Sequence, residues 1–244
     1  MGHAVYPDLK DKGVFITGGA GGIGAAMVRG FAQQGARTVF VDIDAEAGAA
    51  LAEDTGATFV PCDITDTARL EAIIDGHGPL SVLVNNAAHD QRRALADLTP
   101  DYWRERLAVN LDHVVFAARA ARRQMAELGG GSIINFGSTN WLAGGKGMIA
   151  YQTAKAGIHG LTKGLANEFG AQNIRVNCIL PGWVMTQRQR DLWYSDEGQY
   201  WLDENQVLPG HIQPEDVAEM ALFLGSDAAR FCSAQFFTVD GGLT

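Results

Sequence analysis

The sequence places a tyrosine and a lysine four residues apart, at Tyr151 and Lys155, in a stretch of helix-forming residues. Apolar residues recur at helical spacing over positions 150–165, so we expect one helix to carry both side chains on the same face. A free phenol has a pKa of about 10 and is a poor base near pH 7. Because a fixed ammonium one turn away favours the phenolate, the spacing indicates a general acid or base for an alcohol or ketone.

Ser138 follows an apolar run at residues 132–137 that reads as a strand. Its hydroxyl could hydrogen-bond the same substrate oxygen as Tyr151. A tyrosine and a lysine at this spacing also arise by chance, so the pair gains weight only from the motifs around it.

A glycine-rich loop near the start of the chain joins a short apolar strand to a helix. Gly18, Gly22, Ile23 and Gly24 form its core. Glycine lets the backbone turn tightly and approach a pyrophosphate, whose charge is favoured at a helix N-terminus. A plain tight turn is the alternative, but the flanking strand and helix favour nucleotide binding.

Asp42 ends the next predicted strand, residues 38–42. A carboxylate there can accept hydrogen bonds from the ribose hydroxyls of adenosine and would repel a 2′-phosphate. No Lys or Arg lies in the glycine loop or just after Asp42, which also favours NAD over NADP. Alternatively Asp42 or Asp44 caps the following helix, and Asp44 is better placed to do so.

Strands and helices alternate along the rest of the chain, which predicts a parallel sheet wound on both faces. We expect further strands at residues 58–62, 80–84, 132–137, 174–180 and 234–239, and helices at 45–53, 66–75 (capped by Thr65 or Asp66), 100–128 and 150–165. Thr17, Asp42, Asp63, Asn86 and Ser138 all fall at strand ends. Ligands bind beyond the carboxyl ends of such strands, so we expect these side chains to meet.

Asn110 lies inside the apolar part of the predicted helix 100–128 and therefore needs a hydrogen-bond partner. It is either a buried structural amide or a brace, through water, for the active-site lysine.

Composition excludes several classes of function. The chain has 244 residues, is 47% hydrophobic and carries a formal net charge of −9, which argues against nucleic acid or an anionic membrane as partner. It has no apolar run of about 18 residues, and its first residues do not resemble a signal peptide, so we expect a cytoplasmic protein. Cys62, Cys178 and Cys232 are too far apart for a zinc motif and are expected to be buried thiols.

Together these residues resemble the short-chain dehydrogenase/reductase family. The matching motifs are Thr17-Gly-x-x-x-Gly22-x-Gly24, Asp63, Asn85-Asn-Ala87, Asn110, Ser138, Tyr151-x-x-x-Lys155 and Pro181-Gly182 with Thr186. The resemblance implies one domain over residues 1–244, a Rossmann-type doubly wound seven-stranded sheet, a nicotinamide cofactor and a homotetramer. One departure is Ala88, where the family usually has glycine.

The resemblance also implies residue roles. Tyr151 is the acid/base, Ser138 orients the substrate oxygen, Lys155 holds the nicotinamide ribose and lowers the tyrosine pKa, and Asn110 anchors a water. The expected NAD contacts are Gly18, Gly22, Ile23, Gly24, Asp42, Ile43, Asp63, Ile64, Asn86, Ala87, Tyr151, Lys155, Pro181, Gly182, Val184 and Thr186. Residues 10–130 would hold the nucleotide and residues 131–244 the substrate.

A closer similarity is to bacterial NAD-dependent aldose 1-dehydrogenases of the xylose type, carried by the Tyr-Pro-x-Leu-Lys start, Trp141 and the segment from Thr186 to Tyr194. It implies oxidation of a sugar at C1 to a lactone. Aromatic and amide side chains in residues 183–201 suit the apolar face and hydroxyls of a sugar. The expected substrate contacts are Ser138, Asn140, Trp141, Tyr151, Gln187 and Trp193.

Other functions stay open at this point. The aromatic residues could instead pack a mobile lid or a subunit contact. The enzyme could act on another polar alcohol, a polyol or a 3-oxoacyl thioester, although Asp42 opposes the NADPH that reductive biosynthesis usually draws on. A non-catalytic nucleotide sensor is disfavoured because all four catalytic positions are present.

Overall fold

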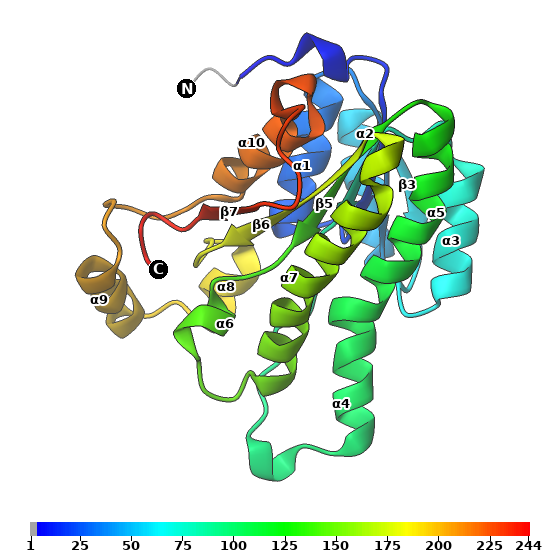
Figure 1. The fold of residues 1–244 in the computed structure, drawn as a ribbon. Helices are drawn as coiled ribbons and strands as arrows, with labels where there is room; N and C mark the ends of the chain where they lie inside the picture. The colour runs from blue at the N-terminus through cyan, green and yellow to red at the C-terminus, as the bar shows by residue number, and fades with distance from the viewer. Residues whose placement is uncertain (1–3) are drawn as a thin grey trace.

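The computed structural model describes residues 4–244, and within them seven parallel strands form one sheet in the order β3-β2-β1-β4-β5-β6-β7 (Figure 1). The strands are β1 (Gly13–Thr17), β2 (Arg37–Asp42), β3 (Thr58–Pro61), β4 (Val82–Asn85), β5 (Gly131–Phe136), β6 (Ile174–Pro181) and β7 (Phe236–Val239). The order reverses direction between β1 and β4, as in Rossmann-type sheets. The predicted fold class is therefore confirmed.

Helices cover both faces of the sheet (Figure 1). They are α1 (Gly22–Gln33), α2 (Ala45–Thr55), α3 (Thr67–Gly76), α4 (Pro100–Leu107), α5 (His113–Glu127), α6 (Asn140–Ala143), α7 (Ile149–Phe169), α8 (Gln187–Leu192), α9 (Asp196–Asn205) and α10 (Pro214–Gly225). The short helices α6, α8 and α9 lie on the side towards which the strands point (Figure 1).

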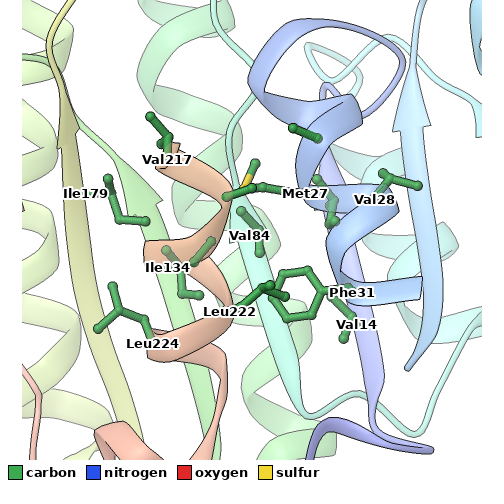
Figure 2. Close-up of a cluster of buried hydrophobic side chains, with 14 of the residues drawn as sticks. Val14, Met27, Val28, Phe31, Val84, Ile134, Ile179, Val217, Leu222 and Leu224 are labelled. Atoms are coloured by element: carbon green, nitrogen blue, oxygen red, sulfur yellow. The ribbon is translucent and has the colours of Figure 1, made fainter. Parts of the chain in front are cut away.

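The two largest hydrophobic clusters hold these layers together, one on each face of the sheet. In one, Phe31 of α1 lies between Val14 of β1 and Leu222 of α10 (Figure 2). All three side chains are at most 2% exposed. Full burial of an apolar side chain of this size stabilises the fold by about 1.5–3 kcal/mol.

The opposite face carries a second cluster, built from α3, α5 and α7 against the other side of the same strands. Phe15 and Leu83 face this cluster, while their neighbours Val14 and Val84 face the first. Side chains alternate between the two faces of a strand, so strands buried on both sides must be apolar throughout. This explains the continuous apolar runs in the sequence.

The predicted long helix over residues 100–128 differs in one respect from the structure. A π-helical segment, Ala108–Asp112, separates α4 from α5 and has Asn110 at its centre. Such segments widen one helical turn and are frequent at functional sites. The other predicted elements are present, with ends shifted by a few residues, and α6, α8, α9 and α10 were not predicted.

Cys62 and Cys178 are buried as expected, but Cys232 is partly exposed, because it lies in the loop before β7. Among residues 4–244, no helix is both long and apolar enough to cross a membrane. The sequence-based statement about a signal peptide concerns the first residues, and residues 1–3 lie outside the described part of the chain.

Candidate active site

A cleft of about 1190 Å³ runs along the carboxyl ends of the strands. All sixteen residues predicted to contact NAD line it, and so do Ser138, Asn140 and Gln187. The structure thus brings these side chains together from distant parts of the chain, as the strand-end positions predict.

The glycine loop between β1 and α1 is packed tightly against the first turn of α1. A Cβ atom on Gly24 would lie 1.9 Å from the carbonyl oxygen of Gly18, so no side chain fits there. Gly18 and Gly22 have φ angles of +66° and +52°, a region that disfavours other residues. The loop therefore presents bare backbone to the cleft at the start of α1.

Asp42 lies at the end of β2 and lines the cleft. Its Oδ2 accepts a hydrogen bond of 2.9 Å from the backbone of Ala20 in the glycine loop, and its Oδ1 accepts one of 3.1 Å from Asp44 N. A carboxylate has about four acceptor positions, so two remain for the hydroxyls of a ribose. Asp44 is the helix cap: its side chain accepts from Ala47 N at 3.0 Å.

Asp63, two residues beyond the end of β3, also lines this half of the cleft. Asp63 Oδ1 accepts from the backbone N–H and the hydroxyl of Thr65, at 2.9 and 2.7 Å. Asp66, rather than Thr65, caps α3 by accepting from Arg69 N at 3.0 Å.

Asn86 ties the glycine loop to β4. Its side-chain amide donates to the carbonyl oxygens of Thr17 and Gly18, at 3.1 and 2.8 Å. The Thr17 hydroxyl in turn accepts from Asn86 N and Ala87 N, both at 3.1 Å. The position that was predicted to contact the cofactor thus also fixes the shape of the loop.

Tyr151, Lys155 and Ser138 meet at the other half of the cleft. Tyr151 and Lys155 are one turn apart on α7, as predicted, and Ser138 lies two residues beyond β5. The Ser138 side chain hydrogen-bonds the phenol, and this bond acts to lower the pKa of Tyr151. A substrate oxygen that reached the phenol would therefore also be near the Ser138 hydroxyl.

The predicted lowering of the tyrosine pKa by Lys155 is wrong for this structure. The pKa of Tyr151 is raised to about 12, chiefly by burial, and the nearby charge of Asp90 acts in the same direction. The Lys155 ammonium lies 5.7 Å from the centre of the phenol ring and donates to the carbonyl of Phe136 at 2.7 Å. Burial also lowers the pKa of Lys155 to about 8.

Asn110 has a complete set of structural partners. Its Oδ1 accepts from His89 N at 2.8 Å, and its Nδ2 donates to the carbonyls of Arg106 and His89, at 2.8 and 3.2 Å. The side chain is fully buried. Asn110 therefore fixes the loop after β4 against the π-helical segment, which is the structural alternative raised for it.

Trp141 and Trp193 are absent from the residues that line the cleft, so the structure does not support their predicted contact with substrate. Trp141 donates to His159 Nε2 at 3.3 Å and packs edge-on against that ring. Trp193 is covered by the guanidinium of Arg92, 3.7 Å above its ring. Trp183 and Trp201 line the cleft instead.

Arg92, Glu105 and Arg106 also line the cleft, and none of them was predicted. Arg106 is 7% exposed, pairs with Glu105 and contacts His89 Nδ1 at 2.8 Å. Neither α4 nor the loop before it has a motif that would have marked these residues. No cluster of three metal-binding side chains occurs within residues 4–244.

Comparison with known proteins identifies the family. A family model described as enoyl-(acyl carrier protein) reductase matches residues 18–244. The D-xylose 1-dehydrogenase of Caulobacter vibrioides is 44% identical, over 99% of this chain and 99% of that protein. The probable galactose dehydrogenase of Rhizobium meliloti is 45% identical, over 98% of this chain and 97% of that protein.

The chain belongs to the short-chain dehydrogenase/reductase family. Among solved members, a 7α-hydroxysteroid dehydrogenase complexed with NADH and 7-oxo glycochenodeoxycholic acid is 30% identical, with a TM-score of 0.90 over 97% of this chain and 96% of that one. The chain is thus an oxidoreductase. Its bare glycine loop and the free acceptor positions of Asp42 fit the pyrophosphate and ribose of a nicotinamide dinucleotide.

Proposed function

We propose that this protein is an NAD-dependent dehydrogenase that oxidises the C1 hydroxyl of an aldose to the aldonolactone. The observation that carries the proposal is one continuous cleft with Asp42 in one half and Tyr151 beside Ser138 in the other. The sugar substrate is inferred from the named relatives and from a lining that mixes Trp183 and Trp201 with polar side chains.

The roles proposed for the side chains follow their positions. Tyr151 removes the hydroxyl proton, Ser138 orients the hydroxyl oxygen, and Lys155 contributes a cation and a contact to the nicotinamide ribose. Asn110 acts through the loop it holds. When bound, NAD supplies the hydride acceptor and, in its oxidised form, a positive charge on the nicotinamide ring.

The pKa of Tyr151 sets the energetic demand on the site. Bringing a phenol from about 12 to about 7 takes five pKa units, or about 7 kcal/mol of differential stabilisation. Lys155 alone does not supply this here, so the charges that enter the cleft with the cofactor are part of the proposed activation.

NAD is preferred over NADP because of the charges around Asp42. The cations among the cleft-lining residues are Arg92, Arg106, Lys155 and Arg188, and none belongs to the loop after β2. A 2′-phosphate would therefore meet the Asp42 carboxylate without a compensating charge. The homotetramer remains a prediction from the family resemblance, and the cytoplasmic location remains one from the composition and the first residues of the sequence.

The proposal is tested by initial rates of nicotinamide reduction with aldoses, polyols and simple secondary alcohols, each with NAD and with NADP. We expect fast reduction of NAD by one or a few aldoses, with a lactone as product. Activity with polyols alone would contradict lactone formation. A 3-oxoacyl thioester with NADPH belongs in the panel, because the matched family model carries an acyl carrier protein reductase description; preference for it would contradict both cofactor and substrate.

A further inference from the structure

Asp90 is a carboxylate in the catalytic half of the cleft that the roles above leave unused. It lies in the loop after β4, five residues beyond the end of the strand. Its side chain is 19% exposed, and it lines the cleft. The other acidic side chain in this half, Glu105, is 61% exposed and pairs with Arg106, so it is neither as enclosed nor as free to accept.

Side chains of α8 hold the Asp90 carboxylate in one orientation. Arg188 donates to Oδ1 from Nε and Nη2, at 3.2 and 3.0 Å, and Gln189 Nε2 donates to Oδ2 at 2.9 Å. Gln189 is itself fixed, because its Oε1 accepts from Trp183 Nε1 at 3.0 Å. Of about four acceptor positions on the carboxylate, one on Oδ2 stays free.

The Asp90 carboxylate and the Tyr151 phenol line the same cleft and interact electrostatically. Its negative charge is one of the causes that raise the pKa of Tyr151, which places it within electrostatic range of the reacting oxygen. A substrate bound at Tyr151 would therefore bring its neighbouring groups towards Asp90.

We propose that Asp90 determines specificity by accepting a hydrogen bond from a sugar hydroxyl other than the one oxidised, and that Arg188 and Gln189 orient its carboxylate for this contact. The inference rests on the proposed oxidation of an aldose. An ionised carboxylate can only accept, and a sugar offers donors around the whole ring. An acyl chain offers none, so it would leave a desolvated carboxylate without a partner.

The test couples the enzyme side chain to the substrate hydroxyl. kcat/KM is measured for the best aldose and for its monodeoxy analogues, each of which lacks one hydroxyl, with wild type, Asp90→Ala and Asp90→Asn. In the wild type, loss of the contacted hydroxyl should lower kcat/KM about 10- to 100-fold, as expected for a hydrogen bond to a charged group. In Asp90→Ala the same loss should shrink to about 3-fold or less.

Two further variants separate binding from general disturbance. Asp97→Asn removes an exposed carboxylate from the same loop, outside the cleft lining, and should discriminate between the sugars as the wild type does. Arg188→Met should lower the discrimination ratio, because Asp90 then loses two of its three donors. Thermal unfolding of each variant checks the fold, and Asp90→Asn keeps the side-chain shape if the alanine variant unfolds.

The outcomes are distinguishable. If the wild type oxidises aldoses but Asp90→Ala and Asp90→Asn discriminate against every deoxy analogue as the wild type does, this inference fails and the proposed function stands. If Arg188→Met keeps full discrimination, the orienting role of α8 fails. If the wild type oxidises no aldose, the proposed function fails and this inference fails with it.

Discussion

Tyr151, the proposed acid/base, is buried in a way that works against its ionisation. We expect Tyr151→Phe to lower kcat about 10²- to 10⁴-fold, because the ring remains while the transferable proton is lost. The measurement is the steady-state rate with the best aldose and NAD. Tyr200→Phe, at a tyrosine 68% exposed on α9, should leave the rate unchanged. Near-full turnover by Tyr151→Phe would exclude the proposed base.

The raised pKa of Tyr151 could not be read from the sequence. The spacing of Tyr151 and Lys155 predicts their separation on a helix, and this was correct. It says nothing of how much water the fold removes around the phenol, or of the Phe136 carbonyl that takes the ammonium's hydrogen bond. Those depend on the packing of β5 against α7.

At the scale of elements, the glycine loop and α1 work as one unit through contact between Gly18 and Gly24. We expect Gly24→Ala to weaken NAD binding severely and to destabilise the fold by about 1–3 kcal/mol, since its Cβ would overlap a backbone oxygen that cannot move freely. NAD titration and thermal unfolding measure the two effects.

Gly164→Ala is the matched control. It lies within α7, where an added Cβ meets nothing within 4 Å, so we expect it to keep NAD affinity and to gain about 0.5–1 kcal/mol from helix propensity. Equal NAD affinity in Gly24→Ala and the wild type would contradict the close-approach role of the loop.

How well an element could be predicted depends on its burial. The central strands β1, β4, β5 and β6 are mostly apolar because both of their faces are covered, and the partly exposed edge strands β3 and β7 still carry short apolar runs, so all seven strands were found. The helices α8 and α9 are short and mostly exposed, so their sequences lack a strong apolar period. α10 had a usable signal that was overlooked: Gln213 and Asp216 form a capping box ahead of a helix with Pro214 at its first turn.

The stability of the folded protein depends on pH through one buried histidine, His113, which contacts a residue of the cleft lining. His113 is fully buried, and its Nε2 lies 3.1 Å from the carbonyl oxygen of Ala87. Because a carbonyl only accepts, Nε2 carries the proton of a neutral ring. Burial, with a smaller contribution from the Lys155 charge, lowers the pKa of His113 to about 3.

This pKa predicts how stability changes with pH. The unfolded histidine has a pKa of about 6.5, so below that value the unfolded state binds a proton that the folded state refuses. Stability is therefore fully present above about pH 6.5 and falls as the pH decreases towards 3. From pH 7 to pH 5 the expected loss from this group is about 2 kcal/mol.

His113→Gln tests the prediction, because an amide can still donate to Ala87 but does not titrate. Free energies of unfolding from denaturant titration at pH 7 and pH 5 should show a smaller acid-side loss for the variant than for the wild type. His77→Gln, at the partly exposed end of α3, should follow the wild type. Identical losses in His113→Gln and the wild type would show that His113 does not titrate as described.

The hydrogen bonds from Asn86 to the glycine loop mean that the loop depends on a distant part of the chain for its conformation. Residues 68 positions apart supply the two halves of one structure: Gly18 provides the turn and Asn86 the clamp. During synthesis on the ribosome, the glycine residues of the loop emerge well before Asn86, whose hydrogen bonds fix their conformation. If the same glycine motif were grafted into another protein without an equivalent of Asn86, its sequence would be preserved, but the hydrogen bonds that help to set the loop's conformation would be missing.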